Sequence, residues 1–76
     1  MSDKMIVIRN RYTGSDYAYP ESRFSDLPCC RIEDGKPMQT SMGRNELVSI
    51  LEYGVAYVVG EAKIKLDISY AENMKP

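Results

Sequence analysis

The last third of the chain contains the stretch Val55-Ala-Tyr-Val-Val-Gly-Glu-Ala-Lys-Ile-Lys-Leu-Asp-Ile-Ser-Tyr70. From residue 62 to residue 70, apolar and polar residues alternate without a break. A period of two is typical of a strand with one buried face and one face in water. If Gly60 and Glu61 form a two-residue turn, Val59 faces Ala62, Tyr57 faces Ile64 and Val55 faces Leu66, and these six residues fall on one face. The stretch therefore predicts a C-terminal β-hairpin with strands at 55–59 and 62–70.

The same register assigns side chains to the two faces of the first arm. It places Val55, Tyr57 and Val59 on the buried face of the sheet and Ala56 and Val58 on the opposite face. An uncharged strand of this kind needs cover from another strand, another segment or a second chain.

A short helix is predicted immediately before the hairpin, at about residues 44–53. Leu47, Ile50 and Leu51 recur at i, i+3 and i+4, which is the spacing of one helix face. Gly54 suits the position after the helix, where a left-handed backbone is needed. We expect this helix to pack against the apolar face of the hairpin.

The first half of the chain gives one clear strand and one irregular stretch. The strand is expected from Lys4 to Tyr12, in a central position because residues 5–8 are apolar on both faces. Residues 13–28 read as a turn and a loop, interrupted by a short helical turn that starts at Pro20 and is anchored by Phe24 and Leu27.

A second hairpin is predicted over residues 29–40. Its turn is Asp34-Gly35, a dipeptide favoured in two-residue hairpin turns, which would place Glu33 opposite Lys36. Pro37 restricts its arm to the edge of a sheet. The fold class predicted from these elements is α+β: a small antiparallel sheet of three to five strands packed against one short helix.

Length and charge narrow the class of protein. At 76 residues we expect one small domain over 1–76. Ten basic and eleven acidic residues are interspersed and leave a net charge of −1, which argues against a polyanion binder that works by bulk charge. The apolar runs are far shorter than the ~20 residues of a membrane span, and the opening residues do not resemble a signal peptide. We expect a cytoplasmic protein that does not insert into a membrane.

The chemistry-bearing residues argue against an enzyme. Histidine is absent, which excludes the usual Ser-His and Cys-His catalytic arrangements. The two cysteines, Cys29 and Cys30, are neighbours and cannot complete a zinc site by themselves. Their simplest interpretation is one thiol packed inward and one facing out, and a redox role is the alternative. We expect no metal, no cofactor and no catalytic residue.

Tyrosine is the unusual feature of the composition, with six residues against one Phe and no Trp. Tyr17 and Tyr19 fall in the stretch predicted to be irregular, and tyrosine is enriched at binding hot spots. We take Tyr17, Tyr19, Arg9 and Arg11 as candidate partner-binding residues. The alternative is that the tyrosine rings fold back to cover the core of a small domain.

A second set of candidate residues is basic. Arg9, Arg11, Lys63 and Lys65 would share the exposed side of the sheet if the first and last strands pair. A basic sheet with nearby tyrosines is typical of platforms for single-stranded nucleic acid, whereas an ordinary solvated strand face is the simpler interpretation.

The predicted function is therefore that of a small non-enzymatic binding protein. It would act through protein–protein contacts, with a protein partner or a second copy of itself, as an adaptor or inhibitor of the kind that phages and other mobile elements encode. The alternative is a nucleic-acid-binding module that uses the basic strand face.

Overall fold

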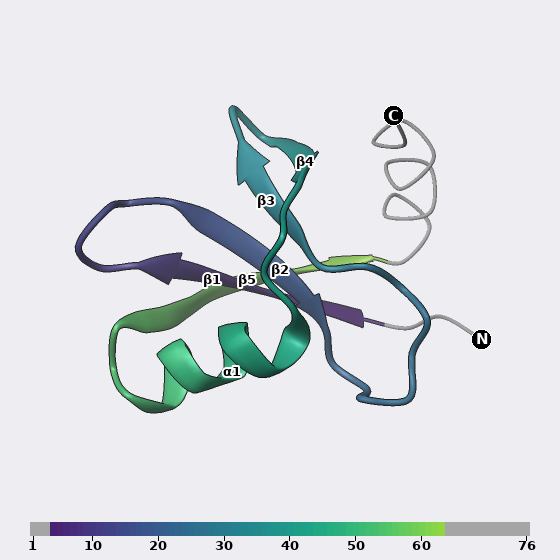
Figure 1. Ribbon diagram of the computed structural model, residues 1–76. Coiled ribbons are helices and arrows are strands. Elements are labelled where there is room, and N and C mark those ends of the chain that lie inside the picture. Colours follow the sequence, from purple (N-terminus) through teal and green to yellow (C-terminus); the bar gives the residue numbers. More distant parts are fainter. Residues whose placement is uncertain (1–3, 64–76) are drawn as a thin grey trace.

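The computed structural model describes residues 4–63 as a five-stranded sheet with one helix (Figure 1). The elements follow one another as β1 (Lys4–Asn10), β2 (Asp16–Pro20), β3 (Cys30–Glu33), β4 (Lys36–Gln39), α1 (Arg44–Glu52) and β5 (Ala56–Lys63). The predicted α+β fold class is confirmed.

The sheet is antiparallel throughout and has the strand order β4-β3-β2-β1-β5. The first four strands follow one another side by side. The segment that contains α1 then carries the chain back across the sheet, so that β5 pairs with β1 (Figure 1). β1 therefore lies between two strands, as its apolar residues predict, and both Met5 and Ile8 are fully buried although they point to opposite faces.

Helix α1 forms where the sequence predicts it, and both of its ends are fixed by local signals. At the start, the backbone N–H of Gly43 donates to the carboxylate of Glu46 at 3.2 Å. At the other end, Tyr53 is the C-cap residue. The next residue, Gly54, has a φ of 79°, in the left-handed region that glycine tolerates best.

Each face of the sheet carries its own apolar cluster. On the face covered by α1, the buried residues are Ile8, Tyr19, Leu47 and Ala56. On the opposite face the buried residues are Met5, Ala18 and Cys30, and Val7, Leu27 and Ile32 pack against them while remaining partly exposed. The core of the protein thus lies on both sides of β1 and β2.

The hairpin of β3 and β4 is also confirmed. Asp34 and Gly35 have positive φ angles of 53° and 75°, as a two-residue turn of this type requires, and Glu33 pairs with Lys36. Pro37 lies in β4, at the edge of the sheet. Figure 1 shows this hairpin projecting away from α1.

The prediction for residues 13–28 is wrong in part. The turn signal at 13–16 is real, but β2 follows it, where a loop was expected. Tyr17 and Tyr19 therefore belong to a strand that pairs with β1 and β3. No helical turn starts at Pro20, and Phe24 is 83% exposed, so it anchors no core; Leu27 does pack, but on the face away from α1. Residues 16–20 form a strand and not a loop because they pair with β1, whose backbone groups on this side would otherwise be unpaired.

The predicted turn at Gly60-Glu61 is not present. Both residues lie inside β5, where Gly60 pairs with Val7 and Glu61 pairs with Ile6. Pairing with the whole length of β1 satisfies more backbone groups than a tight hairpin would, so the long-range ladder overrides the local turn signal. The arm predicted at 62–70 lies outside the described residues after Lys63.

The predicted faces of this strand are also reversed. Ala56 is buried beneath α1, in the cluster that contains Leu47, whereas Tyr57 and Val59 are each 39% exposed. The register with β1 decides this, because Ala56 pairs with Asn10 and falls on the same face as Ile8.

Candidate interaction surface

Most of the exposed apolar side chains among residues 4–63 lie in three neighbouring segments. Of the seven large apolar residues that are exposed in the described part of the chain, five lie in the β1–β2 turn, at the end of α1 and in β5. We call this set, together with the arginine that joins it, the Tyr–Arg surface; it comprises Tyr12, Tyr53, Tyr57, Val58, Val59 and Arg11. Tyr12 and Tyr53 are its most exposed members, at 77% and 84%.

Arg11 ties the two loops of this surface together. Its side-chain Nε donates to the carbonyl oxygen of Gly54 at 2.7 Å, and its backbone N–H donates to the carbonyl oxygen of Val55 at 2.8 Å. Its guanidinium carbon lies 5.1 Å from the ring centre of Tyr57, within the range of a cation–π contact. One side chain therefore holds the β1–β2 turn, the α1–β5 connection and β5 in a fixed relation.

The two most exposed tyrosines stand on turns whose backbones are fixed by hydrogen bonds. The side-chain oxygen of Asn10 accepts from the backbone N–H groups of Tyr12 and Thr13, at 2.8 and 3.0 Å. The backbone N–H of Tyr53 donates to the carbonyl oxygen of Ser49 at 2.9 Å. Large rings on ordered backbones lose little conformational freedom when they meet a partner.

The two arginines of this region differ in their charge partners. Arg9 forms a bidentate ion pair with Asp16, with N–O distances of 2.7 and 3.0 Å, and this carboxylate raises the pKa of Arg9. Within residues 4–63, no carboxylate forms an ion pair with Arg11. The positive charge of Arg11 is thus the one on this surface that is available to an acidic group from outside.

The tyrosines predicted to bind a partner lie elsewhere. Tyr19 is only 7% exposed, and burial raises its pKa. The guanidinium of Arg44 lies 5.4 Å from its ring centre and donates to the carbonyl oxygens of Pro20 and Glu21, both at 2.9 Å. Tyr17 is half-buried and packs against the same cluster under α1. The alternative given above, that these rings cover the core, describes where the structure places them.

The basic residues of the nucleic-acid alternative are not gathered. Arg9 and Arg11 lie at the C-terminal end of β1, where Arg9 pairs with Tyr57. Lys63 pairs with Lys4, at the N-terminal end of β1. Lys65 lies outside the described residues. At the beginning of β1, Lys4 is already balanced by ion pairs with Glu21 and Glu61, at 3.5 and 3.3 Å, which raise the pKa of Lys4.

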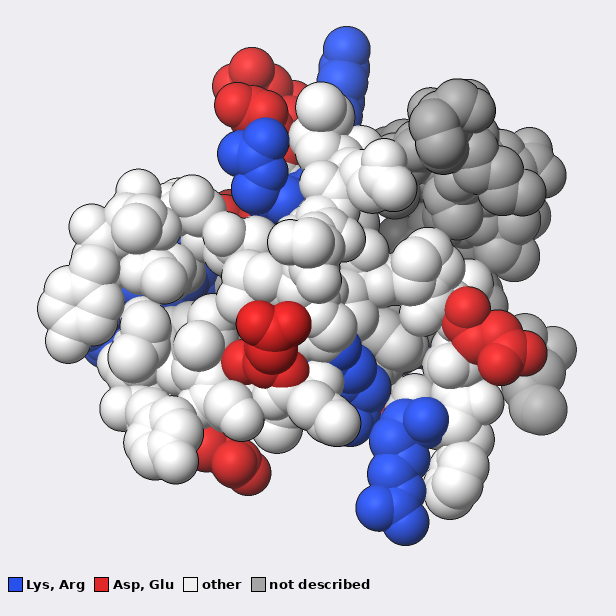
Figure 2. Space-filling model, viewed as in Figure 1, with Lys and Arg blue, Asp and Glu red and all other residues white. Residues whose placement is uncertain are grey.

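The side of the molecule that carries α1 shows no large patch of one charge (Figure 2). Acidic and basic side chains are scattered over it. At the left of this view, where the β1–β2 turn and the α1–β5 connection lie, the surface is largely uncharged, with some blue between the white atoms (Figures 1 and 2).

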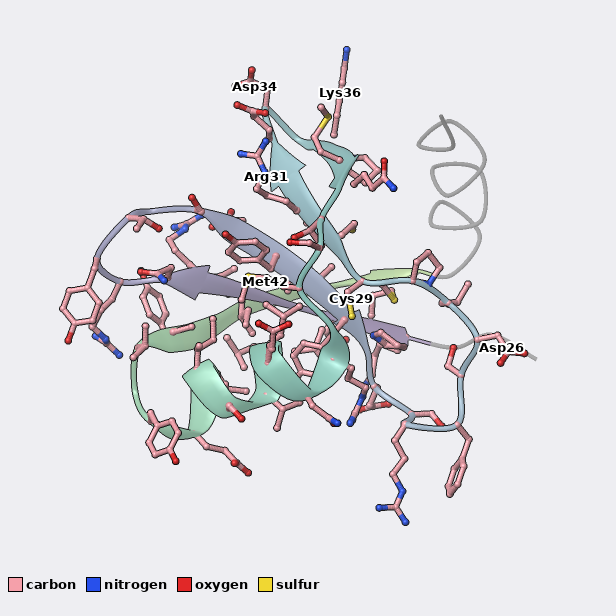
Figure 3. The ribbon with its side chains drawn as sticks, viewed as in Figure 1. Asp26, Cys29, Arg31, Asp34, Lys36 and Met42 are labelled. Carbon is pink, nitrogen blue, oxygen red and sulfur yellow. The ribbon has the colours of Figure 1, made fainter. Side chains whose placement is uncertain are left out.

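The thiols give no sign of activation. Cys29 and Cys30 form no disulfide. Cys30 is buried, and the partial burial of Cys29 raises the pKa of its thiol, which disfavours the reactive thiolate. In Figure 3, Cys29 lies in the segment that leads into β3, and Asp34 and Lys36 extend from the tip of the β3–β4 hairpin. In the described part of the chain, no three His, Cys, Asp or Glu residues come together as a metal site would require.

Comparisons of the chain with protein-family models, with curated proteins and with solved structures found no match. None of the helices described is long and apolar enough to cross a membrane. What the structure defines is a class of fold, a small antiparallel sheet with one helix, and a set of exposed tyrosines in the β1–β2 turn, at the end of α1 and in β5.

Proposed function

We propose that the protein is a small non-enzymatic binding protein and that the Tyr–Arg surface is where it contacts a protein partner. The observation that carries this proposal is the concentration of exposed large apolar side chains there, in five of seven cases. Single exposed apolar residues are normal on a protein surface, whereas a larger exposed apolar area often marks a contact region. Here Arg11 links the two turns and the ring of Tyr57 through a hydrogen bond to Gly54 and a cation–π contact.

The residue types support the same proposal. Tyrosine and arginine are the types most enriched at binding hot spots, because each brings a large rigid contact area together with a polar group. Here the guanidinium of Arg11 lies over the ring of Tyr57, and the exposed Tyr12 and Tyr53 are the chain neighbours of Arg11 and of Gly54, to which Arg11 donates. Among residues 4–63, Arg11 has no carboxylate partner. An adaptor or inhibitor that acts in the cytoplasm is the role that we assign to such a surface.

A nucleic-acid-binding module is the second proposal, and one contact favours it. A single-stranded nucleic acid is held by aromatic rings that stack on bases and by cations that bind phosphate. Arg11 beside Tyr57 is such a combination. Salt separates the two proposals, since each phosphate contact makes the affinity fall with rising salt, and an aromatic protein interface responds far less.

The experiment is affinity capture from a lysate of the natural source with three immobilised forms of the chain. These are the natural sequence, the double variant Tyr12→Ala/Tyr53→Ala, and the variant Phe24→Ala. Phe24 is a matched control because it is 83% exposed and lies in the β2–β3 connection, away from this surface. Neither variant alters a buried residue, so each is expected to fold.

We expect a specific protein to be retained by the natural sequence and by Phe24→Ala, at least tenfold less by the tyrosine variant, and equally after nuclease treatment. Retention that depends on nucleic acid and falls steeply with salt would replace this proposal by the second one. Equal retention by all three forms would place the contact elsewhere on the molecule.

A further inference from the structure

The outer edge of β5 is an unpaired strand edge within the described chain. β5 is the last strand of the sheet order, and its inner edge is taken by β1. The backbone N–H of Arg11 donates to the carbonyl oxygen of Val55, which marks this as a hydrogen-bonded position of the antiparallel ladder, although the N–H of Val55 itself donates to the carbonyl oxygen of Ile50. Two residues further on, Arg9 and Tyr57 form the next such pair.

The two residues that flank Tyr57 in β5 point their backbone groups away from β1. Ala56 and Val58 therefore each present one N–H and one C=O at the outer edge. Over residues 4–63, no backbone hydrogen bond outside the ladder uses these groups. The spacing of two residues is the one that an added strand requires.

The available edge is short. Gly60 pairs with Val7 and Val58 pairs with Ile8, so Val59 has no opposite residue, the pattern of a β-bulge. A bulge interrupts the regular edge, and in natural sheets it limits edge-to-edge pairing. The regular part of β5 before the bulge runs from Ala56 to Val58, which fits a short segment of about three to five residues.

The side chains beside this edge indicate the chemistry of the segment. Val58 is 54% exposed, and the ring of Tyr57 is 39% exposed, so an apolar side chain of the partner has surface to cover. The guanidinium of Arg11 lies against this same ring, and within the described chain it lacks an ion-pair partner. A carboxylate on the added segment would complement this charge.

We propose that the edge Ala56–Val58 accepts an extended segment of a partner protein by β-strand addition, and that an acidic residue of this segment pairs with Arg11. This rests on the proposed function and names the kind of partner. A second copy of the chain fits less well, because residues 55–59 contain no acid. Pairing of two such edges would therefore offer neither Arg11 a carboxylate from residues 55–59.

The test uses peptides selected from a random ten-residue library displayed on phage, with the full chain as target and its Val58→Pro variant as counter-target. Val58→Pro removes one outward N–H at an edge position, where proline is tolerated best. We expect selected peptides to be rich in β-branched and aromatic residues and to share one Asp or Glu. When the Arg11→Glu variant is the target, the selected peptides should carry Lys or Arg at the position where they otherwise share an acid.

The decisive step changes only the peptide. A selected peptide is synthesised with a single N-methyl group at each position in turn, which deletes one N–H at a time. Every second methyl group should weaken binding about tenfold or more, and those between should have little effect, because alternate N–H groups of an added strand face β5. The target keeps its natural sequence, so a failure of a variant to fold cannot imitate this result.

Strand addition would be contradicted if the losses of affinity did not alternate along the methylated peptide. It would also be contradicted if the library yielded no peptide specific for the natural chain. Selected peptides without a shared acid would overturn the assignment to Arg11. A stable dimer of the chain alone at micromolar concentration, abolished by Val58→Pro, would assign the edge to a second copy. The proposed function is tested separately by the lysate experiment. Capture of a protein that depends on Tyr12 and Tyr53 would still support it if each of these peptide tests failed.

Discussion

Tyr57 lies directly opposite Arg9 in the β1–β5 ladder, with the guanidinium of Arg11 5.1 Å from its ring centre. The ring is therefore held at the surface between two arginines and does not enter the core, where Ala56 takes the inward position. Arg11 therefore supports the structure of the region in which we propose that a partner binds.

Replacing Arg11 by alanine should lower the free energy of unfolding by about 1–2 kcal/mol. The variant loses a hydrogen bond to the carbonyl oxygen of Gly54 and the contact with Tyr57. Urea denaturation measures the change. Arg23→Ala is the matched control, since Arg23 lies 5.1 Å from the ring centre of Phe24 in an exposed connection. We expect a loss below about 0.5 kcal/mol there, and equal losses in both variants would contradict the bridging role of Arg11.

Replacing Tyr19 by alanine should destabilise the protein by about 3–5 kcal/mol, because a buried ring beneath α1 is lost. Tyr19→Phe keeps the ring next to Arg44 and should cost about 1 kcal/mol or less. Thermal unfolding followed by circular dichroism compares the two. If Tyr19→Ala unfolded like the natural chain, the assignment of this ring to the core would be wrong. The double change of Tyr17 and Tyr19 to alanine is, for the same reason, unsuited as a test of binding.

Gly54→Ala should cost about 1 kcal/mol, because alanine is strained at a φ of 79° even though the space around this glycine is open. Gly60→Ala is the control. Gly60 has equally open surroundings and no positive φ, and it lies inside a strand, so alanine should be neutral or slightly stabilising. Chemical denaturation should separate the two variants, and a loss at Gly60 as large as at Gly54 would contradict the continuous course of β5.

The thiols should react slowly in the folded chain. Burial raises the pKa of Cys29, so at pH 8 less thiolate is present than in the unfolded chain, and Cys30 is buried. The raised pKa has a consequence for stability. Because the pKa of Cys29 is raised in the folded state, the free energy of unfolding keeps its full value below the pKa of the unfolded thiol and decreases as the pH rises from there through the raised pKa of the folded thiol. Alkylation by iodoacetamide, with and without denaturant, measures the difference. Equal rates in both conditions would contradict the burial of these residues.

The elements predicted correctly from the sequence are those fixed by neighbouring residues. Gly54 ends α1, and Asp34-Gly35 forms the β3–β4 turn, because each conformation is favoured by the residue itself. The strand at Tyr17 and Tyr19 was missed because it is short and is stabilised mainly by its pairing with β1 and β3. The turn expected at Gly60 was wrong because pairing with β1 outweighs a local signal.

The site was harder to predict, for a related reason. The sequence indicates Arg9 and Arg11 as candidate partner-binding residues. It does not indicate Tyr12 and Tyr53, although each lies beside a turn. Two turns that are distant in the chain meet only because α1 returns the chain to β1. The hydrogen bond from Arg11 to Gly54 joins these two turns, and no periodicity in the sequence predicts this contact.

The central claim, that β5 offers an unpaired edge to a partner, is tested most directly by amide hydrogen exchange measured residue by residue by NMR. In the free chain, the N–H of Tyr57 should exchange slowly, because it faces β1, and those of Ala56 and Val58 should exchange quickly. When a selected peptide is bound, the N–H groups of Ala56 and Val58 should become protected, with that of Tyr57 unchanged. Slow exchange at all three positions in the free chain, or no gain at Ala56 and Val58 in the complex, would contradict the account.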